Sequence, residues 1–316
     1  SINNCKVMKK IFFIIGTLFV VNAFAQQEPL FTQYYVNDMV INPAISGSKA
    51  YNPLTILTRQ QWLGFEGAPL STNISYHGTL IDQGRSAMGG YLLFDKATPS
   101  LQANLHLNYA YHVPLNYDDV KLSFGLGAKL MYHNIDFNKE DLPPGNDPAF
   151  STDSYDKTLT DASSGVYLYG KEFYIGFSIS NMFQSSFNTQ VQGSPYPNSE
   201  YRNYYGIGAY KFQVINNDWQ LEPSILIRKM QYQKSLTDLT TRIIFLENNW
   251  AGLTFRDNGT AIFSFGFGAK NTHISYSYDH SFSNEITQYS YGTHELGISF
   301  RIGTLSSQRH TGFWGY

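Results

Sequence analysis

Residues 104–133 carry the most constraining pattern in the chain, an alternation of apolar and polar side chains in two long runs. The first run ends at Leu115 and the second begins at Val120, with a short polar turn between them. Successive side chains of a strand point to opposite faces, so each run presents one apolar and one polar face. Both runs exceed the usual globular strand of about five or six residues, and an outer-membrane strand needs roughly ten. The pattern therefore predicts two walls of a transmembrane β-barrel.

The composition agrees with this prediction. Charged residues make up 15% of the 316 residues and aromatic residues 16%, whereas a soluble domain averages about 25% charged residues. Tyr and Phe suit the two membrane interfaces, and Gly relieves crowding in curved strands. The formal net charge of −2 offers no basic footprint for nucleic acid. We therefore expect outer-membrane lipid as a partner and no nucleic acid.

The N-terminal residues indicate export. We take Met8 as the expected start, with residues 1–7 as upstream sequence and two lysines forming a basic n-region. Residues 11–21 are apolar but too few for a spanning helix of about twenty residues, and a small-x-small cleavage site ends at Ala25. Cleavage there also removes the single cysteine, Cys5. A cysteine-free exported chain suits a barrel, which needs no disulfides.

Beyond the signal peptide we expect a lead-in and one barrel of about fourteen antiparallel strands. The expected parts are 1–25 (upstream residues and signal peptide), 26–52 (lead-in, a plug or a periplasmic rim), 53–302 (β-barrel) and 303–316 (C-terminal periplasmic tail). The expected strands are 54–60, 72–81, 86–94, 104–115, 120–133, 159–169, 173–181, 204–212, 219–228, 236–246, 250–256, 261–269, 273–279 and 295–302.

The connections between these strands support the barrel independently. Short connections occupy every second position, whereas the long connections, 138–157, 182–202 and 281–293, all fall on the other parity. Bacterial barrels have short periplasmic turns and longer extracellular loops. We therefore expect the long loops on the cell surface and both ends of the chain in the periplasm.

Two blocks after the signal peptide resemble a known family. They comprise residues 28–34 (EPLFTQY), Asn37, residues 41–44 (INPA) and Gly47, followed by residues 59–69 (RQQWLGFEGAP). Together they are similar to the opening motifs of the PorP/SprF family, outer-membrane proteins of the type IX secretion and gliding-motility apparatus of Bacteroidetes. Glu28 stands where the family usually has Asp, and Ile45-Ser46 replaces the usual aromatic or small pair.

The resemblance implies a role rather than a reaction. It implies a non-enzymatic, integral outer-membrane protein that supports export or surface retention of a secreted adhesin. The implied partners are the adhesin's C-terminal secretion domain and periplasmic or outer-membrane components of the secretion system; we expect no cofactor, metal or catalytic residue. The candidate partner-contact or family-motif residues are Asn42, Pro43, Ala44, Gly47, Arg59, Gln61, Trp62, Gly64 and Pro69.

These motif residues also have a purely structural interpretation. Pro43 biases Asn42 toward extended backbone, Gly47 permits a tight turn, and Trp62 is suited to a membrane interface. By strand parity, Trp62 would be extracellular and Asn42 periplasmic. A single docking site containing both therefore requires the lead-in to thread the lumen.

Inward-facing polar residues leave two alternative functions open. Ionisable residues of both signs predict salt bridges across the lumen rather than a selective channel, which more often shows one sign; they are Lys121, Lys129, Asp161, Glu222, Arg228, Arg242, Lys270, Asp279, Glu295 and Arg301. Histidines also face inward, at His77, His106, His112, His133 and His273, but no metal spacing accompanies them. A small-solute channel would need a wet, continuous lumen. An outer-membrane hydrolase would need a histidine clustered with Ser or Asp at the outer rim.

Overall fold

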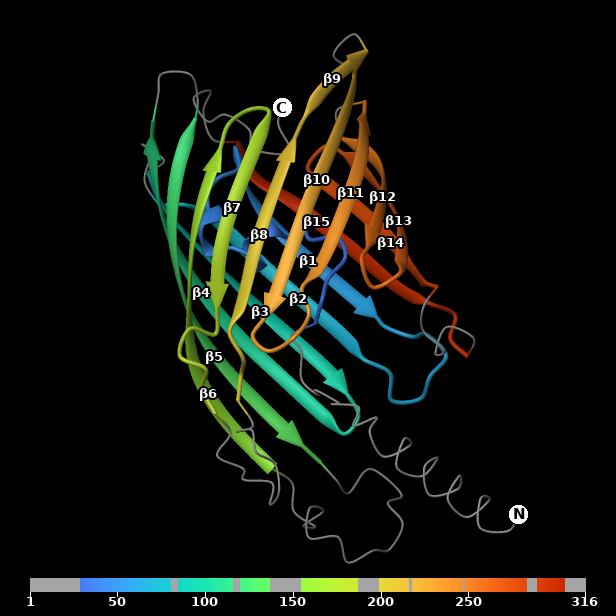
Figure 1. Ribbon diagram of the computed structural model, residues 1–316. Helices are drawn as coiled ribbons and strands as arrows, with labels where there is room; N and C mark the ends of the chain where they lie inside the picture. The colour runs from blue at the N-terminus through green and yellow to red at the C-terminus, as the bar shows by residue number, and fades with distance from the viewer. Residues whose placement is uncertain are drawn as a thin grey trace, which may run out of the picture. The chain divides into compact units, whose positions relative to one another are not determined.

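The computed structural model describes residues 29–80, 85–115, 120–136, 155–186, 199–215, 218–246, 248–282 and 289–304. Phe31–Tyr316 forms one compact unit, whose described part is a closed antiparallel barrel (Figure 1). Its elements are η1 (Asp38–Val40), η2 (Pro43–Ile45), β1 (Tyr51–Gln60), β2 (Leu70–Thr79), β3 (Ser86–Ala97), β4 (Ser100–Pro114), β5 (Lys121–Ile135), β6 (Tyr155–Tyr169), β7 (Phe173–Ser180), β8 (Asn203–Tyr210), β9 (Phe212–Ile215), β10 (Trp219–Met230), β11 (Leu236–Phe245), β12 (Asn249–Arg256), β13 (Thr260–Ala269), β14 (Thr272–Ser281) and β15 (Thr293–Thr304).

The strands pair in chain order and the sheet closes on itself. β1 pairs with both β2 and β15, and β10 pairs with β11, so the described sheet has no gap. The sheet contains 15 strands, but β8 and β9 pair with the same strand, β10, and are separated only at Lys211. They therefore act as one interrupted strand of the barrel. Counted in this way the barrel has fourteen strands, which confirms the predicted strand count and fold class.

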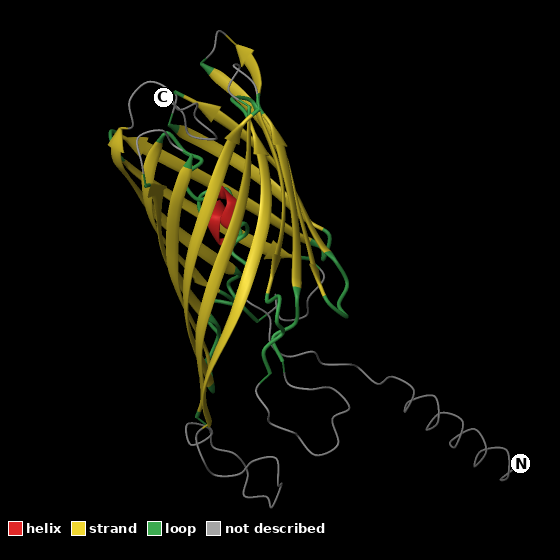
Figure 2. Ribbon diagram, turned by 90° about the vertical axis from the view of Figure 1, so that its left-hand side faces the viewer, coloured by secondary structure: helices red, strands yellow, loops and turns green. Residues whose placement is uncertain are grey.

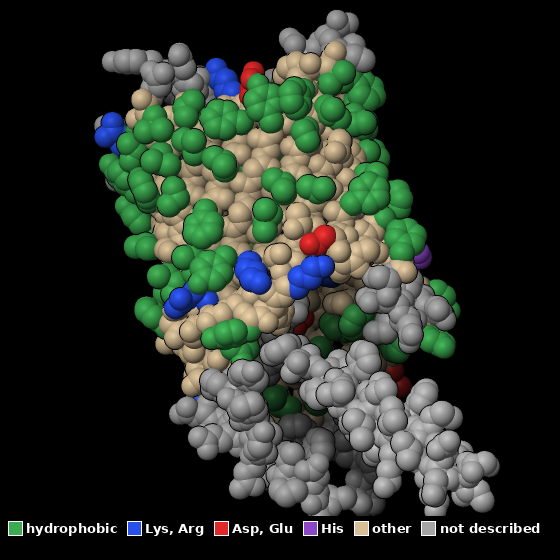
Figure 3. All heavy atoms as spheres, viewed as in Figure 1, with side chains coloured by type: hydrophobic (Ala, Val, Ile, Leu, Met, Phe, Trp, Pro, Cys, Tyr) green, Lys and Arg blue, Asp and Glu red, His purple; other side chains and the backbone are tan. Residues whose placement is uncertain are grey.

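The hairpin of β4 and β5 confirms the alternation from which the prediction began. Leu105 pairs with Leu130 and Tyr109 with Leu126, all with exposed side chains, whereas Asn104 and His106 are buried. The apolar face therefore points outward and the polar face into the lumen. On the face shown in Figure 3, hydrophobic side chains are spread over the outer surface, and a few basic side chains lie in its lower part. β4 begins four residues earlier than predicted and β5 ends two residues later, because the alternation continues there, whereas each strand is one residue shorter at the turn that joins them.

The two ends of the barrel differ in the length of their connections. One end, the short-turn end, carries brief connections such as 170–172 and 270–271, and lies at the top of Figure 1 with β9. The other, the long-loop end, carries 136–154, 181–202 and 282–292, as the parity predicted. The signal peptide, the turn at 116–119, most of loop 138–157, residues 187–198 and the tail 305–316 lie outside the described residues.

No helix in the described part of the chain is both long and apolar enough to cross a bilayer.

The lead-in lies inside the barrel. Residues 31–39 and 42–49 are buried, and the short helices η1 and η2, red in Figure 2, lie within the ring of strands. Asn42 caps η2, where its side-chain oxygen accepts a hydrogen bond from Ala44 N, and Pro43 occupies the first turn. Pro is favoured there because its missing N–H has no helical partner to lose.

Candidate functional site

The lead-in is attached to the long-loop end of the barrel by three charged side chains, which we call the latch: Arg59, Asp279 and Glu295. Arg59 donates to Asp279 at 2.8 Å and to Glu295 at 3.3 Å. Glu295 accepts the backbone N–H groups of Thr32 at 2.8 Å and Gln33 at 2.9 Å. The Thr32 hydroxyl donates to Asp279 and accepts from Arg59.

The latch buries more negative than positive charge. The side chains of Asp279 and Glu295 are 4% and 0% exposed, and that of Arg59 is 8% exposed. A buried carboxylate is costly unless charge and hydrogen bonds satisfy it. One guanidinium faces two carboxylates here, and the lead-in supplies the additional N–H and hydroxyl donors. The latch is therefore complete only when the lead-in is in place.

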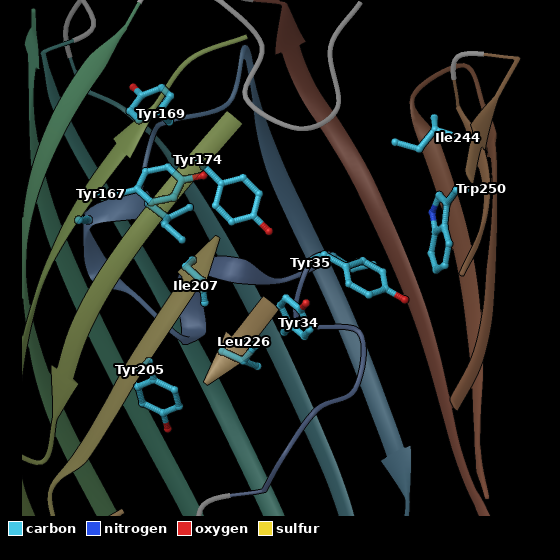
Figure 4. Packing of buried hydrophobic residues seen from close by; sticks show 13 residues of the cluster. Tyr34, Tyr35, Tyr167, Tyr169, Tyr174, Tyr205, Ile207, Leu226, Ile244 and Trp250 are labelled. Carbon is cyan, nitrogen blue, oxygen red and sulfur yellow. The ribbon is translucent and has the colours of Figure 1, made fainter. Parts of the chain in front are cut away.

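Two tyrosines of the lead-in fill the middle of the lumen (Figure 4). Tyr35 donates to Ser264 at 2.8 Å, meets the Trp250 ring edge-on at 5.1 Å, and lies 4.1 Å beneath the Arg242 guanidinium. The Tyr34 hydroxyl lies 3.0 Å from that of Ser224. Cation–π and edge-to-face contacts of this kind stabilise desolvated aromatic rings. These contacts bring the lead-in against β10, β11, β12 and β13.

The Asn-Pro-Ala turn of the lead-in occupies a notch in the opposite wall, which we call the glycine notch: Gly125, Gly165 and Gly176 of β5, β6 and β7. Asn42 donates to the carbonyls of Val166 and Phe177, at 3.0 and 3.4 Å. A Cβ on Gly125 would lie 2.5 Å from Ala44 Cα and closer still to its nitrogen. A Cβ on Gly165 would collide with the Asn42 side chain. Only glycine lets the turn approach the sheet this closely.

Two of the predicted inward histidines hold the end of the lead-in. His77 Nδ1 accepts from Gly47 N at 2.9 Å, and His112 Nε2 lies 2.8 Å from Ser46 O. Gly47 has a φ of +74°, and a Cβ there would collide with Ala87. Both the conformation and the space therefore require glycine. These histidines act as hydrogen-bonding partners of the backbone.

The second motif block continues into a hydrogen-bonded loop, residues 61–69, at the long-loop end. Leu63 exchanges backbone hydrogen bonds with the β14–β15 loop: Leu63 N donates to Gly292 O and Tyr291 N to Leu63 O, both at 2.8 Å. A Cβ on Gly64 would lie 2.9 Å from the Tyr291 ring. Trp62 has a φ of +48°, which a bulky residue rarely adopts. The two loops thus form one surface, with Leu63, Phe65, Tyr289 and Tyr291 exposed.

The structure divides the nine candidate residues into two groups. Asn42, Pro43, Ala44, Gly47 and Arg59 are buried in the lumen, whereas Gln61, Trp62, Gly64 and Pro69 lie in the loop at the long-loop end. The buried and loop groups meet at Arg59, which lies two residues before the loop and contacts Thr32 of the lead-in at 2.7 Å. Thr32, Gln33, Tyr34 and Tyr35 were not predicted as site residues. The sequence did contain one signal that a segment is packed inside the lumen: the inward-facing glycines of β5, β6 and β7, which leave room for it.

The predicted lumen charges are mostly placed as expected. The ion pairs include Arg242–Glu222, Lys129–Glu200 at 3.3 Å and the two-pronged pair of Arg256 with Asp238, both contacts at 2.7 Å. Lys121 and Arg301 are half-buried. Lys270 was wrongly predicted to face inward: β13 ends at Ala269, and Lys270 is exposed in the following turn.

The described residues contain no group of three or more His, Cys, Asp or Glu side chains that would hold a metal. One Ser–His contact lies at the long-loop end, where Ser100 Oγ is 2.8 Å from His133 Nε2. It links the neighbouring strands β4 and β5, a cross-strand role that such polar pairs commonly have.

The fold and the occupied lumen define a class: a membrane β-barrel whose interior is filled by its own N-terminal segment. A family model described as "Type IX secretion system membrane protein PorP/SprF" matches residues 23–300. The chain therefore belongs to the PorP/SprF family, as the two motif blocks predicted, and is an outer-membrane protein of the type IX secretion system.

Solved structures resemble the chain only distantly. They include the CymD monoaromatic hydrocarbon channel (11% identity, TM-score 0.49, 84% of this chain and 93% of that one). The P. putida toluene transporter TodX gives 9% identity and a TM-score of 0.47, over 84% and 94% of the two chains. The Acinetobacter baumannii outer membrane protein Omp33 gives 6% identity and a TM-score of 0.45, over 81% of this chain and 100% of that one. Similarity this low says nothing about what this chain binds. No curated protein matches it.

Proposed function

We propose that this barrel is a non-enzymatic component of type IX secretion and gliding motility. It supports the export or surface retention of a secreted adhesin and links it to periplasmic machinery. Family membership supports the pathway. The proposed role of the barrel within that pathway depends on one observation: residues 31–49 fill the lumen and are hydrogen-bonded to the surrounding strands. A barrel whose lumen is filled in this way is better suited to act as a scaffold than as a conduit.

The filled lumen argues against a passive channel. A wet pore needs a continuous polar path, but here aromatic rings, ion pairs and the Asn-Pro-Ala turn occupy the interior. Displacing the lead-in would take the Thr32 and Gln33 donors away from the carboxylates of the latch and open the glycine notch. We therefore expect the resting barrel to be closed.

The long-loop end offers the surface on which a secreted partner would dock. Tyr289 and Tyr291 are 74% and 76% exposed, and Leu63 and Phe65 are each 42% exposed. Backbone hydrogen bonds between the two loops hold part of this surface in one conformation. Exposed apolar patches on a rigid support mark interaction sites, and aromatic residues are enriched at interface centres. The four loop residues of the motif, Gln61, Trp62, Gly64 and Pro69, maintain this surface.

The test is a mild-detergent pull-down of tagged protein from native outer membranes, followed by mass spectrometry. We expect a large secreted adhesin and periplasmic secretion subunits in the wild-type sample. The double variant Leu63→Ser/Tyr291→Ser should lose the adhesin by about 10-fold or more, since an interface anchor contributes around 2 kcal/mol. Val214→Ser, at an apolar side chain 56% exposed on β9 at the short-turn end, is the matched control and should retain it.

Two results would contradict the proposal. The wild-type protein could be recovered alone and conduct ions in planar bilayers, which would favour the small-solute channel. Alternatively, the loop variant could retain the adhesin as well as Val214→Ser does, which would place the docking surface elsewhere.

A further inference from the structure

We infer that the chain preceding Phe31 leaves the barrel through its long-loop end, so that the mature N-terminus is on the same side of the membrane as the long loops. Simple parity of strands places both ends of the chain on the short-turn side. The path of the lead-in through the lumen reverses this for the N-terminus. The inference does not depend on which partner the barrel serves.

The first contacts of the lead-in lie at the long-loop end. Thr32 and Gln33 are bonded to the latch. Arg59 is the penultimate residue of β1, Glu295 is near the start of β15, and Asp279 is near the end of β14. All three positions adjoin the connections 61–69 and 282–292, which belong to the long-loop end.

The last contacts of the lead-in lie at the opposite end. His112, which contacts Ser46 O, is close to the end of β4 at Pro114, and His77, which accepts from Gly47 N, is close to the end of β2 at Thr79. Both strands end at short connections. The chain then enters β1 at Tyr51, whose partner is Thr304 at the end of β15.

The intermediate contacts show that the path runs in one direction. Tyr35 meets Ser264 in the middle of β13, and the Asn37 side chain exchanges hydrogen bonds with Asn73 and Ser75 within β2. The lead-in thus passes once through the lumen, from the long-loop end to the short-turn end, and β1 returns through the wall.

The N-terminus is too short to return to the other side. If cleavage follows Ala25, only residues 26–30 precede Phe31, and five extended residues reach at most about 17 Å. The hydrocarbon layer is about 30 Å thick. A route outside the wall would place unpaired backbone in lipid, and the route inside is occupied by the lead-in itself. The first residues of the mature chain therefore remain at the long-loop face, which barrels present to the exterior.

Cysteine labelling of whole cells tests this placement. The only native cysteine, Cys5, precedes the expected cleavage site, so Gln27→Cys would carry the sole thiol of the mature chain. Two reference variants mark the two faces: Tyr289→Cys at the long-loop end, 74% exposed, and Lys171→Cys in the exposed β6–β7 turn at the short-turn end. Each is treated with a membrane-impermeant maleimide–polyethylene glycol before and after permeabilisation, and heat-modifiable gel mobility confirms that each barrel is folded.

We expect Gln27→Cys to be labelled with Tyr289→Cys in intact cells, while Lys171→Cys is labelled only after permeabilisation. If the barrel were oriented the other way, Gln27→Cys and Tyr289→Cys would still share one response, and the threading would stand. The inference is overturned if Gln27→Cys follows Lys171→Cys. It is also overturned if Gln27→Cys becomes reactive only after denaturation in detergent at high temperature.

Discussion

The seat of the Asn-Pro-Ala turn can be tested by adding a single methyl group. In Gly125→Ala, the new Cβ would lie 2.5 Å from both Ala44 Cα and Pro43 C and closer still to Ala44 N. These atoms belong to backbone, so no side-chain rotation relieves the clash. The turn must move away from β5, and the hydrogen bonds from Asn42 to Val166 and Phe177 then weaken or break.

The expected cost follows from these contacts. Overpacking a tight site costs about 1–3 kcal/mol, and each lost hydrogen bond contributes about 1 kcal/mol more. A total near 3 kcal/mol would raise the undocked fraction of the lead-in by roughly 100-fold, because each 1.4 kcal/mol is a factor of ten. The barrel wall itself should remain paired.

Trypsin provides the assay. Lys49 is the only basic residue between residues 31 and 50, it is 3% exposed, and it is paired with Asp38 at 2.7 Å. When opening and closing are fast, cleavage after Lys49 reports the undocked population. Mass spectrometry of that bond should show cleavage about 100-fold faster in Gly125→Ala than in the wild type.

Gly206→Ala is the matched control, because a Cβ at Gly206 of β8 meets no atom within 4 Å. It should be cleaved at the wild-type rate. Equal cleavage of the two variants, with both barrels intact, would refute the idea that the glycine notch seats the lead-in.

Two further predictions concern the latch and the Ser–His pair. Arg59→Gln leaves Asp279 and Glu295 buried without their cation and should cost about 3–5 kcal/mol, seen as a lower midpoint of heat-modifiable mobility. Adding Asp279→Asn should recover part of the loss, and no recovery would mean that the carboxylates are satisfied in another way. Ser100→Ala removes the hydroxyl beside His133 and should leave adhesin recovery unchanged; loss of an esterase activity of purified wild-type barrel in this variant would instead reveal a catalytic pair.

The sequence predicts the wall of this protein far better than its interior. Strand periodicity depends on each residue's own polarity. The fourteen strands and their outward-facing side chains can therefore be predicted from the local sequence pattern. The partners of inward side chains depend on residues far away in sequence. Thr32 meets Asp279 and Glu295, and no local rule links residues so distant. Glycine was expected in general to relieve crowding in curved strands, whereas Gly125 and Gly165 make room for the lead-in.

The path of the lead-in through the lumen connects the two motif blocks, which strand parity alone places at opposite ends of the barrel. Strand parity places Asn42 and Trp62 at opposite ends, so a single docking site seemed excluded unless the lead-in crossed the lumen. The lead-in does cross it, and Arg59 joins the two blocks: it contacts Thr32 at 2.7 Å and is followed, after Gln60, by the loop that carries Trp62. Glu295, which accepts from Thr32 and Gln33, lies in the strand that follows Tyr291. Both loops of the exposed aromatic surface are thus anchored on the latch. Because neighbouring contacts that share partners are energetically coupled, displacing the lead-in should loosen the docking surface, and a partner that binds this surface should in turn hold the lead-in in place.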